Sequence, residues 1–372
     1  MSGVLVLVTG NGRSGTSTMS GLLHHLGLSV PGPYVGANDS NPKGFFESRW
    51  SVRFHNSLIS DAGVNIFDSR PEAFDRIQAK VTPGVRDRLR GFLTQHVTDG
   101  NNDQIVVKDP RAMWVPNLWR DTAAEVGLST RFVVMLRHPA ETVGSRTTHY
   151  VDDDEEKVHR FTIANLARWT NAALITERET RGSERLFVRY PDLLADWRSV
   201  AAELRDRLGL VLNTDLAIGE HHPADDFVDP GLRRHQPSWE GLDVPVPLRD
   251  VAQETWDQLD GLAGTGDDAR AAPAFDTLAE SYRKVLADAN ALSWDRILGA
   301  REQGRSETPP AGPLLSEVGG RDLARELRGR IARRLRRESA PTPSRSLRWP
   351  FYESAKIHAP GAQPGGQAHR SR

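Results

Sequence analysis

The sequence contains no cysteine among its 372 residues. This absence excludes disulfide bonds, thiolate metal ligands and cysteine nucleophiles. Long apolar runs are also missing: the first run, residues 4–9, has no basic flank, and no later run approaches the length of about 20 residues that spans a membrane. We therefore expect a soluble cytoplasmic protein, and the chain is long enough to bury a full core.

The formal net charge of −1 conceals a strong asymmetry. Residues 301–372 hold fifteen Lys and Arg against seven Asp and Glu, a net charge of +8, which leaves −9 for residues 1–300. We therefore expect two domains, a folded domain over residues 1–300 and a basic tail, rich in Pro, Gly and Arg, over residues 301–372.

Within the tail, residues 321–338 have the pattern of a basic amphipathic helix. Four apolar residues recur at four-residue intervals among arginines, namely Leu323, Leu327, Ile331 and Leu335. Two interpretations remain open: the leucines pack on the folded domain, or the helix docks on a membrane surface or on a partner. The sequence gives no prediction of the oligomeric state.

The beginning of the chain reads as a strand, a glycine loop and a helix. Residues 4–9 form a short apolar strand, residues 10–15 a loop with three glycines, and the following residues have apolar side chains at helical spacing. Glycines allow backbone conformations that are closed to other residues, and the free N–H groups of a helix's first turn attract anions. The segment therefore predicts a phosphate-binding loop, although a glycine turn without a ligand remains an alternative.

Two familiar phosphate loops fit these glycines, each incompletely. Gly10, Gly12 and Gly15 have the spacing of the dinucleotide fingerprint, but the second strand that should follow is replaced by a Pro- and Gly-rich loop. The spacing of Gly10 and Gly15 also suits a Walker A loop, but Thr16 occupies the position of its lysine. The basic residue of this loop is Arg13 instead.

Strands and helices alternate along the first 208 residues. Strands are predicted at residues 4–9, 105–107, 131–136 and 185–189, with helices between them. This pattern indicates an α/β fold, a three-layer αβα architecture with a central parallel sheet. Ligands of such sheets bind beyond the carboxyl ends of the strands, where the glycine loop is joined by three further side chains, Lys108, Arg137 and Tyr190.

These residues together resemble the sulfotransferases that use 3′-phosphoadenosine 5′-phosphosulfate (PAPS). Residues 12–17, Gly-Arg-Ser-Gly-Thr-Ser, are similar to the family's 5′-phosphosulfate loop, and Arg137 followed by Ser145 is similar to its 3′-phosphate site. Residues 189–194 resemble its Arg-Tyr-Glu-Asp-Leu segment, with Pro191 in place of Glu. Residues 41–47 and 108–111 resemble the bacterial branch in particular. The resemblance covers roughly residues 1–208.

The resemblance implies PAPS as the sulfuryl donor and no metal. It implies that PAPS is bound by one loop and by three further side chains. These residues are Gly12, Arg13, Ser14, Gly15, Thr16, Ser17, Arg137, Ser145 and Tyr190. Arg13 would neutralise charge at the 5′-phosphosulfate, and Lys108 would stabilise the leaving oxygen or the sulfuryl group.

The general base cannot be carried over directly, because the histidine that follows the strand-two lysine in vertebrate relatives is replaced by Asp109. We assign the base to Glu47, which lies where related branches have a glutamate. The alternative is that Glu47 pairs locally with Lys43 or Arg49. Asp109 and His55 are expected to be structural.

The acceptor is predicted only as a hydroxyl of a carbohydrate, a glycolipid or a small metabolite, and no nucleic-acid partner is expected. Two other functions remain open: a P-loop kinase or NTPase with a degenerate loop, and a non-catalytic nucleotide-binding adaptor. Arg233 and Arg234 either contact the 3′-phosphate or form a surface cluster. The adjacent His221 and His222 have metal-capable side chains but lie in a loop that is typically solvated, and no metal site is predicted.

Overall fold

The computed structural model describes residues 3–37, 41, 43–99, 103–150, 154–216, 220–232, 237–265, 269–296, 298–299 and 302. The chain forms two compact units, residues 1–286 and 287–372. The predicted basic helix at residues 321–338, and also Arg233 and Arg234, lie outside the described residues. The domain boundary at residue 300 stays a prediction.

A parallel sheet forms the centre of the first unit, as the sequence predicts. Its strands are β1 (Gly3–Gly10), β2 (Gln104–Lys108), β3 (Leu128–Leu136) and β4 (Arg185–Arg189). Their order in the sheet is β2-β1-β3-β4, and all three pairings are parallel. The central strand β1 therefore carries the glycine loop between the carboxyl ends of β2 and β3.

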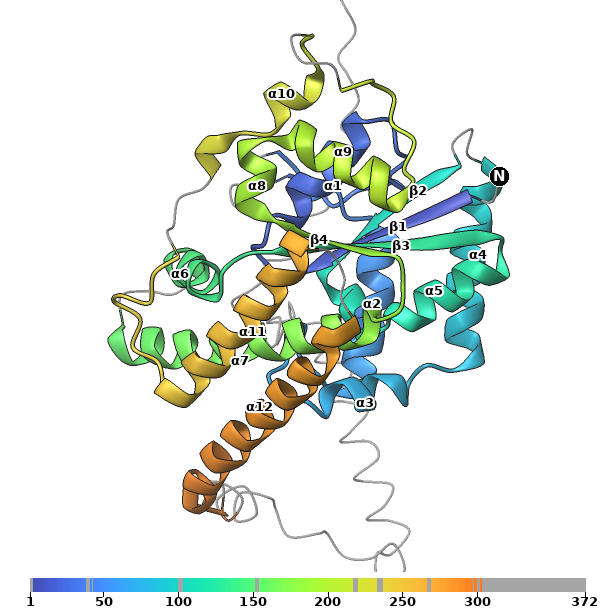
Figure 1. Cartoon of the computed structure of the whole chain (residues 1–372). Helices are drawn as coiled ribbons and strands as arrows, with labels where there is room; N and C mark the ends of the chain where they lie inside the picture. Colours follow the sequence, from blue (N-terminus) through green and yellow to red (C-terminus); the bar gives the residue numbers. More distant parts are fainter. Residues whose placement is uncertain are drawn as a thin grey trace, which may run out of the picture. The chain divides into compact units, whose positions relative to one another are not determined.

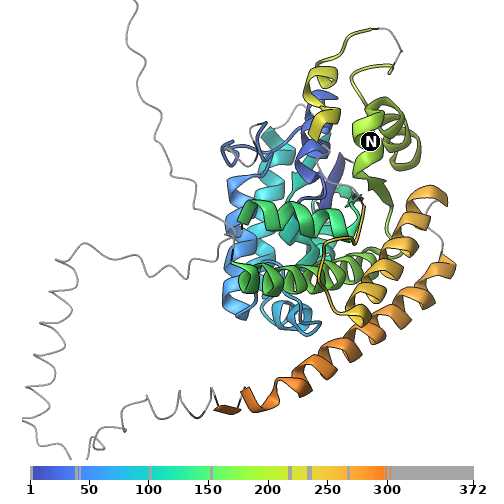
Figure 2. The same ribbon diagram turned by 90° about the vertical axis from the view of Figure 1, so that its left-hand side faces the viewer.

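Helices cover both faces of the sheet (Figure 1 and Figure 2). Alternate residues of β1 belong to two separate apolar cores, Leu5 and Leu7 to one and Val6 and Val8 to the other. Successive side chains of a strand point to opposite faces, so this division shows that both faces are buried. The predicted three-layer αβα architecture is confirmed.

Four helices lie on the face of Val6 and Val8, namely α1 (Thr16–His25), α8 (Tyr190–Ala195), α9 (Trp197–Leu208) and α10 (Pro223–Phe227). The opposite face is covered by α2 (Arg49–Ala62), α3 (Ala73–Gln78), α4 (Pro83–Asp99), α5 (Pro116–Glu125), α7 (Glu155–Thr180), α11 (Val246–Thr265) and the first turns of α12 (Ala272–Leu292). Helix α6 (Pro139–Tyr150) follows β3, and the short 3₁₀ helix η1 (Pro110–Trp114) follows β2.

Local chemistry sets where the helices next to the site begin. Ser48 caps α2, its side chain accepting the N–H of Trp50 at 3.3 Å. Asp109 caps η1 in the same way, accepting the N–H of Arg111 at 2.9 Å. Such caps satisfy N–H groups that have no partner within the helix. As a result, Glu47 and Lys108 immediately precede rigid, capped elements.

The buried contacts of α12 come from its earlier turns, through Phe275, Leu278 and Tyr282. The Tyr282 hydroxyl lies 2.6 Å and 2.7 Å from the carbonyl oxygens of Ser69 and Ala167, and burial raises its pKa.

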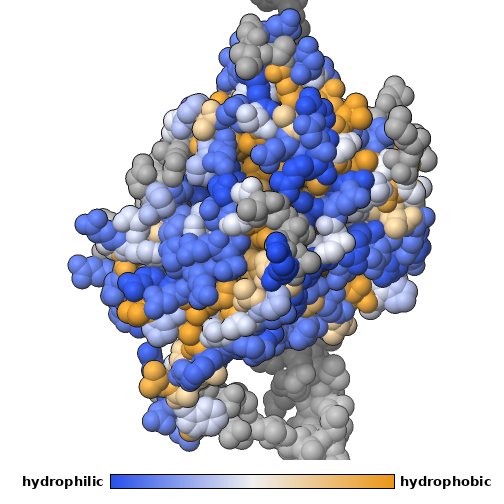
Figure 3. Space-filling view, viewed as in Figure 1, coloured by the Kyte–Doolittle hydropathy of each residue, from blue (hydrophilic) through white to orange (hydrophobic). Residues whose placement is uncertain are grey.

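The surface seen in Figure 3 is largely hydrophilic, with apolar residues scattered over it. None of the helices within the described ranges is both long and apolar enough to cross a membrane.

Candidate functional site

The glycine loop between β1 and α1 has a left-handed backbone at two positions and leads into a helix without a side-chain cap. Arg13 and Gly15 have positive φ angles of 72° and 90°. A Cβ on Gly15 would lie 2.1 Å from the Tyr190 ring, so glycine is required there for space as well as for conformation. Helix α1 has no side-chain cap and no acidic residue in its first turn. Its first N–H groups are therefore available to a bound phosphate.

Arg146 and Asn11 also hold the loop in place through hydrogen bonds. Neither was predicted as a site residue from the sequence. Arg146 donates to the carbonyl of Gly12 at 3.3 Å and to Asn165 Oδ1 at 3.0 Å, and its guanidinium lies 4.6 Å from the centre of the Phe67 ring. Asn11 Nδ2 donates to the carbonyl of Trp169 at 3.3 Å. The one signal in the sequence was that Arg146 directly follows Ser145.

Four predicted donor-binding residues meet beside β3. Arg137 donates from NH1 to the carbonyl of Arg13 at 2.9 Å and from Nε to Glu141 Oε2 at 2.9 Å. Arg13 Nε lies 3.4 Å from Ser145 Oγ, and the Arg137 guanidinium lies 5.3 Å from the centre of the Tyr190 ring. We call these five residues, Arg13, Arg137, Glu141, Ser145 and Tyr190, the β3 cluster.

The β3 cluster contains two arginines and the carboxylate of Glu141. Burial raises the pKa of Tyr190, although a hydrogen bond with Thr18 and the charges of Arg137 and Arg13 oppose that rise, and the charge of Asp229 adds to it. The Tyr190 hydroxyl is therefore protonated at neutral pH. Guanidinium groups such as those of Arg13 and Arg137 are suited to a dianionic group such as a phosphate.

The two predicted catalytic residues beside β2 form a buried ion pair. Lys108 Nζ lies 2.6 Å from Glu47 Oε1, and the two residues are 2% and 1% exposed. The alternative of local pairing is wrong, because Lys43 donates to the carbonyl of Phe227 and Arg49 to that of Tyr34. A buried carboxylate needs such a partner, since an isolated charge is costly away from water.

The two carboxylate oxygens of Glu47 differ in their hydrogen bonding. Among the described residues, Glu47 Oε2 has no hydrogen-bond partner, and Arg111 NH1 lies 3.6 Å from it. Buried polar atoms are normally hydrogen-bonded, so one that is not calls for a functional explanation. This oxygen has a lone pair available to a group that enters the site.

Asp109 and His55 are buried neighbours of this pair, as expected of structural residues. Asp109 lies 2.8 Å from Arg111 NH1 and 2.8 Å from His55 Nδ1. Burial alone would raise the pKa of Asp109, but the Arg111 guanidinium and the hydrogen bonds hold it well below its usual range. We call these residues, Glu47, His55, Lys108, Asp109 and Arg111, the β2 cluster.

The strand order places the two clusters on opposite sides of the glycine loop. Residue Lys108 of β2 pairs in register with Val8 of β1, and Met135 of β3 pairs with Gly10. The β2 cluster therefore lies at one side of the loop and the β3 cluster at the other.

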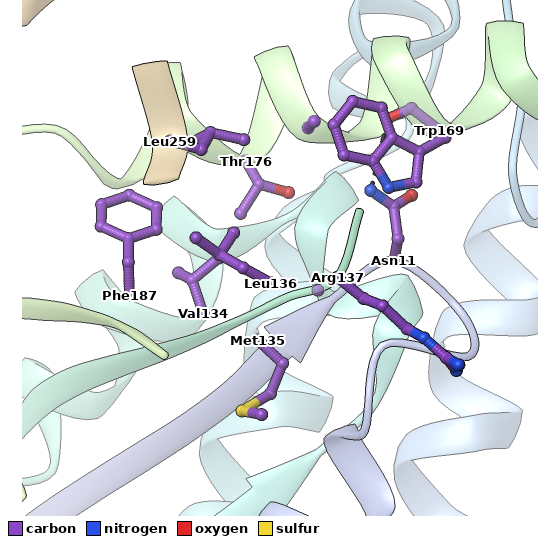
Figure 4. Close-up of a pocket in the computed structure, with 11 residues that line it drawn as sticks. Asn11, Val134, Met135, Leu136, Arg137, Trp169, Thr176, Phe187 and Leu259 are labelled. Atoms are coloured by element: carbon purple, nitrogen blue, oxygen red, sulfur yellow. Dashed lines mark hydrogen bonds between the residues drawn. The ribbon is translucent and has the colours of Figure 1, made fainter. Parts of the chain in front are cut away.

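A small cavity lies behind the loop, between the sheet and helices α7 and α11 (Figure 4). Its volume is about 10 Å³, room for a single water molecule. Val134, Phe187 and Leu259 line it, and the charged end of Arg137 extends away from them. The cavity is too small and too apolar to hold a nucleotide.

The His221-His222 loop does not gather metal ligands. His222 caps helix α10 by accepting the N–H of Ala224 at 3.1 Å, and His221 lies 3.3 Å from Asp226. Over the described part of the chain, no three His, Asp or Glu side chains come together in a way that would hold a metal ion.

A family model described as "Sulfotransferase family" matches residues 6–214, more than half of the chain. The chain belongs to the sulfotransferase family. The matched range contains every predicted catalytic and donor-binding residue, from Gly12 to Tyr190. The function is therefore sulfuryl transfer, and the protein is a transferase.

Two solved structures are similar to this sulfotransferase. One is the sulfotransferase domain from the olefin synthase of Synechococcus PCC 7002, at 17% identity and a TM-score of 0.40, covering 69% of this chain and 94% of that one. The other is the sulfotransferase domain from the curacin biosynthetic pathway, at 17% identity and a TM-score of 0.37, covering 70% and 98%. Comparison with curated proteins gives no match.

Proposed function

We propose that this sulfotransferase moves the sulfuryl group of PAPS to a hydroxyl of a carbohydrate, a glycolipid or another small metabolite. The proposal rests on two separated anion-binding regions, the N–H groups at the start of α1 and the arginines of the β3 cluster. PAPS has anionic groups at both ends of a nucleoside, whereas a nucleoside triphosphate has them at one end. Two separated sites therefore favour PAPS over ATP.

The residues present fit such a donor. The N–H groups of Gly15 to Ser17, at the start of α1, would hold the 5′-phosphate, since the helix offers no side-chain cap of its own. The N–H of Ser14 instead donates to the carbonyl of Asn11 at 3.1 Å. Arg137 and Ser145 would hold the 3′-phosphate. Arg13 was predicted to serve the 5′ end, and its contact with Ser145 supports a position from which it also serves the 3′ end.

The β2 cluster is suited to the chemical step. Glu47 Oε2 takes the proton of the acceptor hydroxyl, whose oxygen forms a bond to sulfur. The bond between sulfur and the bridging oxygen breaks, and its electron pair stays on the 5′-phosphate oxygen. Lys108, which pairs with Glu47 before the donor binds, turns to the bridging oxygen of the bound donor and donates to it as its negative charge develops.

Sulfate transfer from PAPS to a panel of hydroxyl acceptors tests the proposal, together with calorimetric titration of adenosine 3′,5′-bisphosphate (PAP). We expect PAP to bind, and Arg137→Ala to weaken that binding. Absence of PAP binding, or a Mg²⁺-dependent preference for ATP, would contradict the proposal and favour a kinase or NTPase. Hydrolysis of PAPS to PAP and sulfate, with water as the acceptor, measures the same step when no acceptor in the panel reacts.

A further inference from the structure

Arg111 lies between the two carboxylates of the β2 cluster. Its NH1 is 2.8 Å from Asp109 Oδ1 and 3.6 Å from Glu47 Oε2, and the residue is 2% exposed. The longer distance is beyond a hydrogen bond. Arg111 therefore places a positive charge beside Glu47 Oε2 without occupying the lone pair that would accept a proton.

A chain of buried hydrogen bonds fixes Arg111 in this position. The Trp119 indole N–H donates to His55 Nε2 at 2.9 Å. Because indole nitrogen only donates, His55 Nε2 must be unprotonated, and the ring proton lies on Nδ1. His55 Nδ1 then donates to Asp109 Oδ2 at 2.8 Å, which orients Asp109 towards Arg111. His55 is thus neutral, and Asp109 is the counter-ion of Arg111.

The charges of the β2 cluster balance. Lys108 and Arg111 are positive, Glu47 and Asp109 are negative, and the neutral His55 adds no charge. In the proposed reaction, Lys108 turns to the leaving oxygen, which would leave Glu47 without a partner. A buried carboxylate in that state readily takes up a proton and ceases to be a base.

We infer that Arg111 is a positioning residue for Glu47. It keeps the carboxylate ionised and aimed while Lys108 is engaged with the donor, and Asp109 and His55 hold it in place. Arg111 acts through Glu47 and needs no contact with the reacting atoms. The inference rests on the proposed function, in which Glu47 is the base.

The test uses the double variant Arg111→Gln with Asp109→Asn. It removes one charge of each sign, so that no buried charge loses its only partner. The pH–rate profile of PAPS hydrolysis and the affinity for PAP are measured, with Arg120→Gln as a matched control, since Arg120 is an exposed arginine that pairs with Asp121. We expect kcat to fall about 100-fold, as misplaced catalytic groups typically do.

Two further readouts separate positioning from a general structural role. In the single variant Arg111→Gln, the acidic limb of the pH–rate profile should move up by about one pH unit, because a positive charge beside Glu47 is lost while Asp109 keeps its negative charge. The affinity for PAP should stay that of the wild type. Arg111→Lys, which keeps the charge, should leave the acidic limb close to its wild-type position.

Either of two results would overturn the inference: an unchanged kcat in the double variant together with an unchanged pH profile in Arg111→Gln, or a loss of kcat matched by an equal loss of PAP affinity. Glu47→Gln in the same assay distinguishes a failure of the proposed function from a failure of the role inferred for Arg111. If Glu47→Gln keeps the wild-type kcat, the proposed function fails. If it loses kcat while the double variant does not, only the role of Arg111 fails.

Discussion

The two clusters beside the glycine loop differ in charge balance and in exposure. In the β2 cluster, two cations and two carboxylates are all at most 2% exposed and paired with one another. In the β3 cluster, two arginines face one carboxylate, and Arg13 is half-buried. We propose that the two clusters have different roles. The arginines beside β3 bind the donor, and the buried, charge-balanced groups beside β2 carry out sulfuryl transfer.

The largest predicted difference between the two clusters is in their effect on turnover. Glu47→Gln removes the proposed base but keeps the shape of the side chain, and we expect kcat for sulfate transfer to fall about 10²- to 10⁴-fold. The affinity for PAP should change little, because PAP is held on the other side of the loop. A variant that loses PAP affinity as strongly as it loses kcat would contradict the division between the clusters.

The next effect concerns stability and pH. Asp109→Asn removes the counter-ion of a buried arginine, and we expect the free energy of unfolding at neutral pH to fall by about 3–5 kcal/mol. The pKa of Asp109 is lower in the folded protein than its ordinary value of 3.8. Its stabilisation is therefore present above that value and is lost as the pH falls through the lower, folded-state pKa.

The difference between wild type and Asp109→Asn should accordingly be constant from about pH 7 to pH 5 and should narrow below about pH 4. Urea unfolding at a series of pH values measures it. A difference that stays the same down to pH 3 would mean that Asp109 does not titrate as a buried counter-ion.

Donor binding should depend on the β3 cluster. Arg137→Ala removes a charged hydrogen-bond donor, and we expect the Kd for PAP to rise about 10- to 100-fold. Arg137→Lys should fall between wild type and the alanine variant, because lysine keeps the charge but not the planar fork. Calorimetric titration measures both, and the exposed Arg120→Ala serves as the control, with an expected Kd equal to that of the wild type.

The smallest predicted effect lies in the loop that separates the clusters. Gly15→Ala imposes a left-handed backbone on alanine, which costs about 1–2 kcal/mol before the contact with the Tyr190 ring is counted. We expect a lower melting temperature and weaker PAP binding. A variant with wild-type stability would show that the loop adopts another conformation than the one described.

Much of the fold could be predicted because the apolar patterns were local and strong. Strand β4 was predicted with the bounds that the structure has, residues 185–189. The order of the strands was not predicted, since it depends on contacts between distant segments. Short helices such as α3 and α10 carry too few residues to show a periodicity.

Candidate site residues could be chosen from motifs, but their pairings could not be predicted. Glu47 and Lys108 are 61 positions apart, and nothing in either segment indicates that they pair. Local pairing of Glu47 was the alternative because the sequence shows only neighbours. The contacts of Arg111 and Arg146 were not predicted for the same reason, since they join groups that are distant in the sequence.

The central claim is tested most directly by the preference for PAP over AMP, which lacks the 3′-phosphate. Calorimetric Kd values for both nucleotides are measured with wild type, Glu47→Gln and Arg137→Ala. We predict that wild type and Glu47→Gln prefer PAP to the same degree, and that Arg137→Ala loses most of this preference. An Arg137→Ala variant that keeps the full preference, or a Glu47→Gln variant that loses it, would contradict the assignment of binding and chemistry to separate sides of the loop.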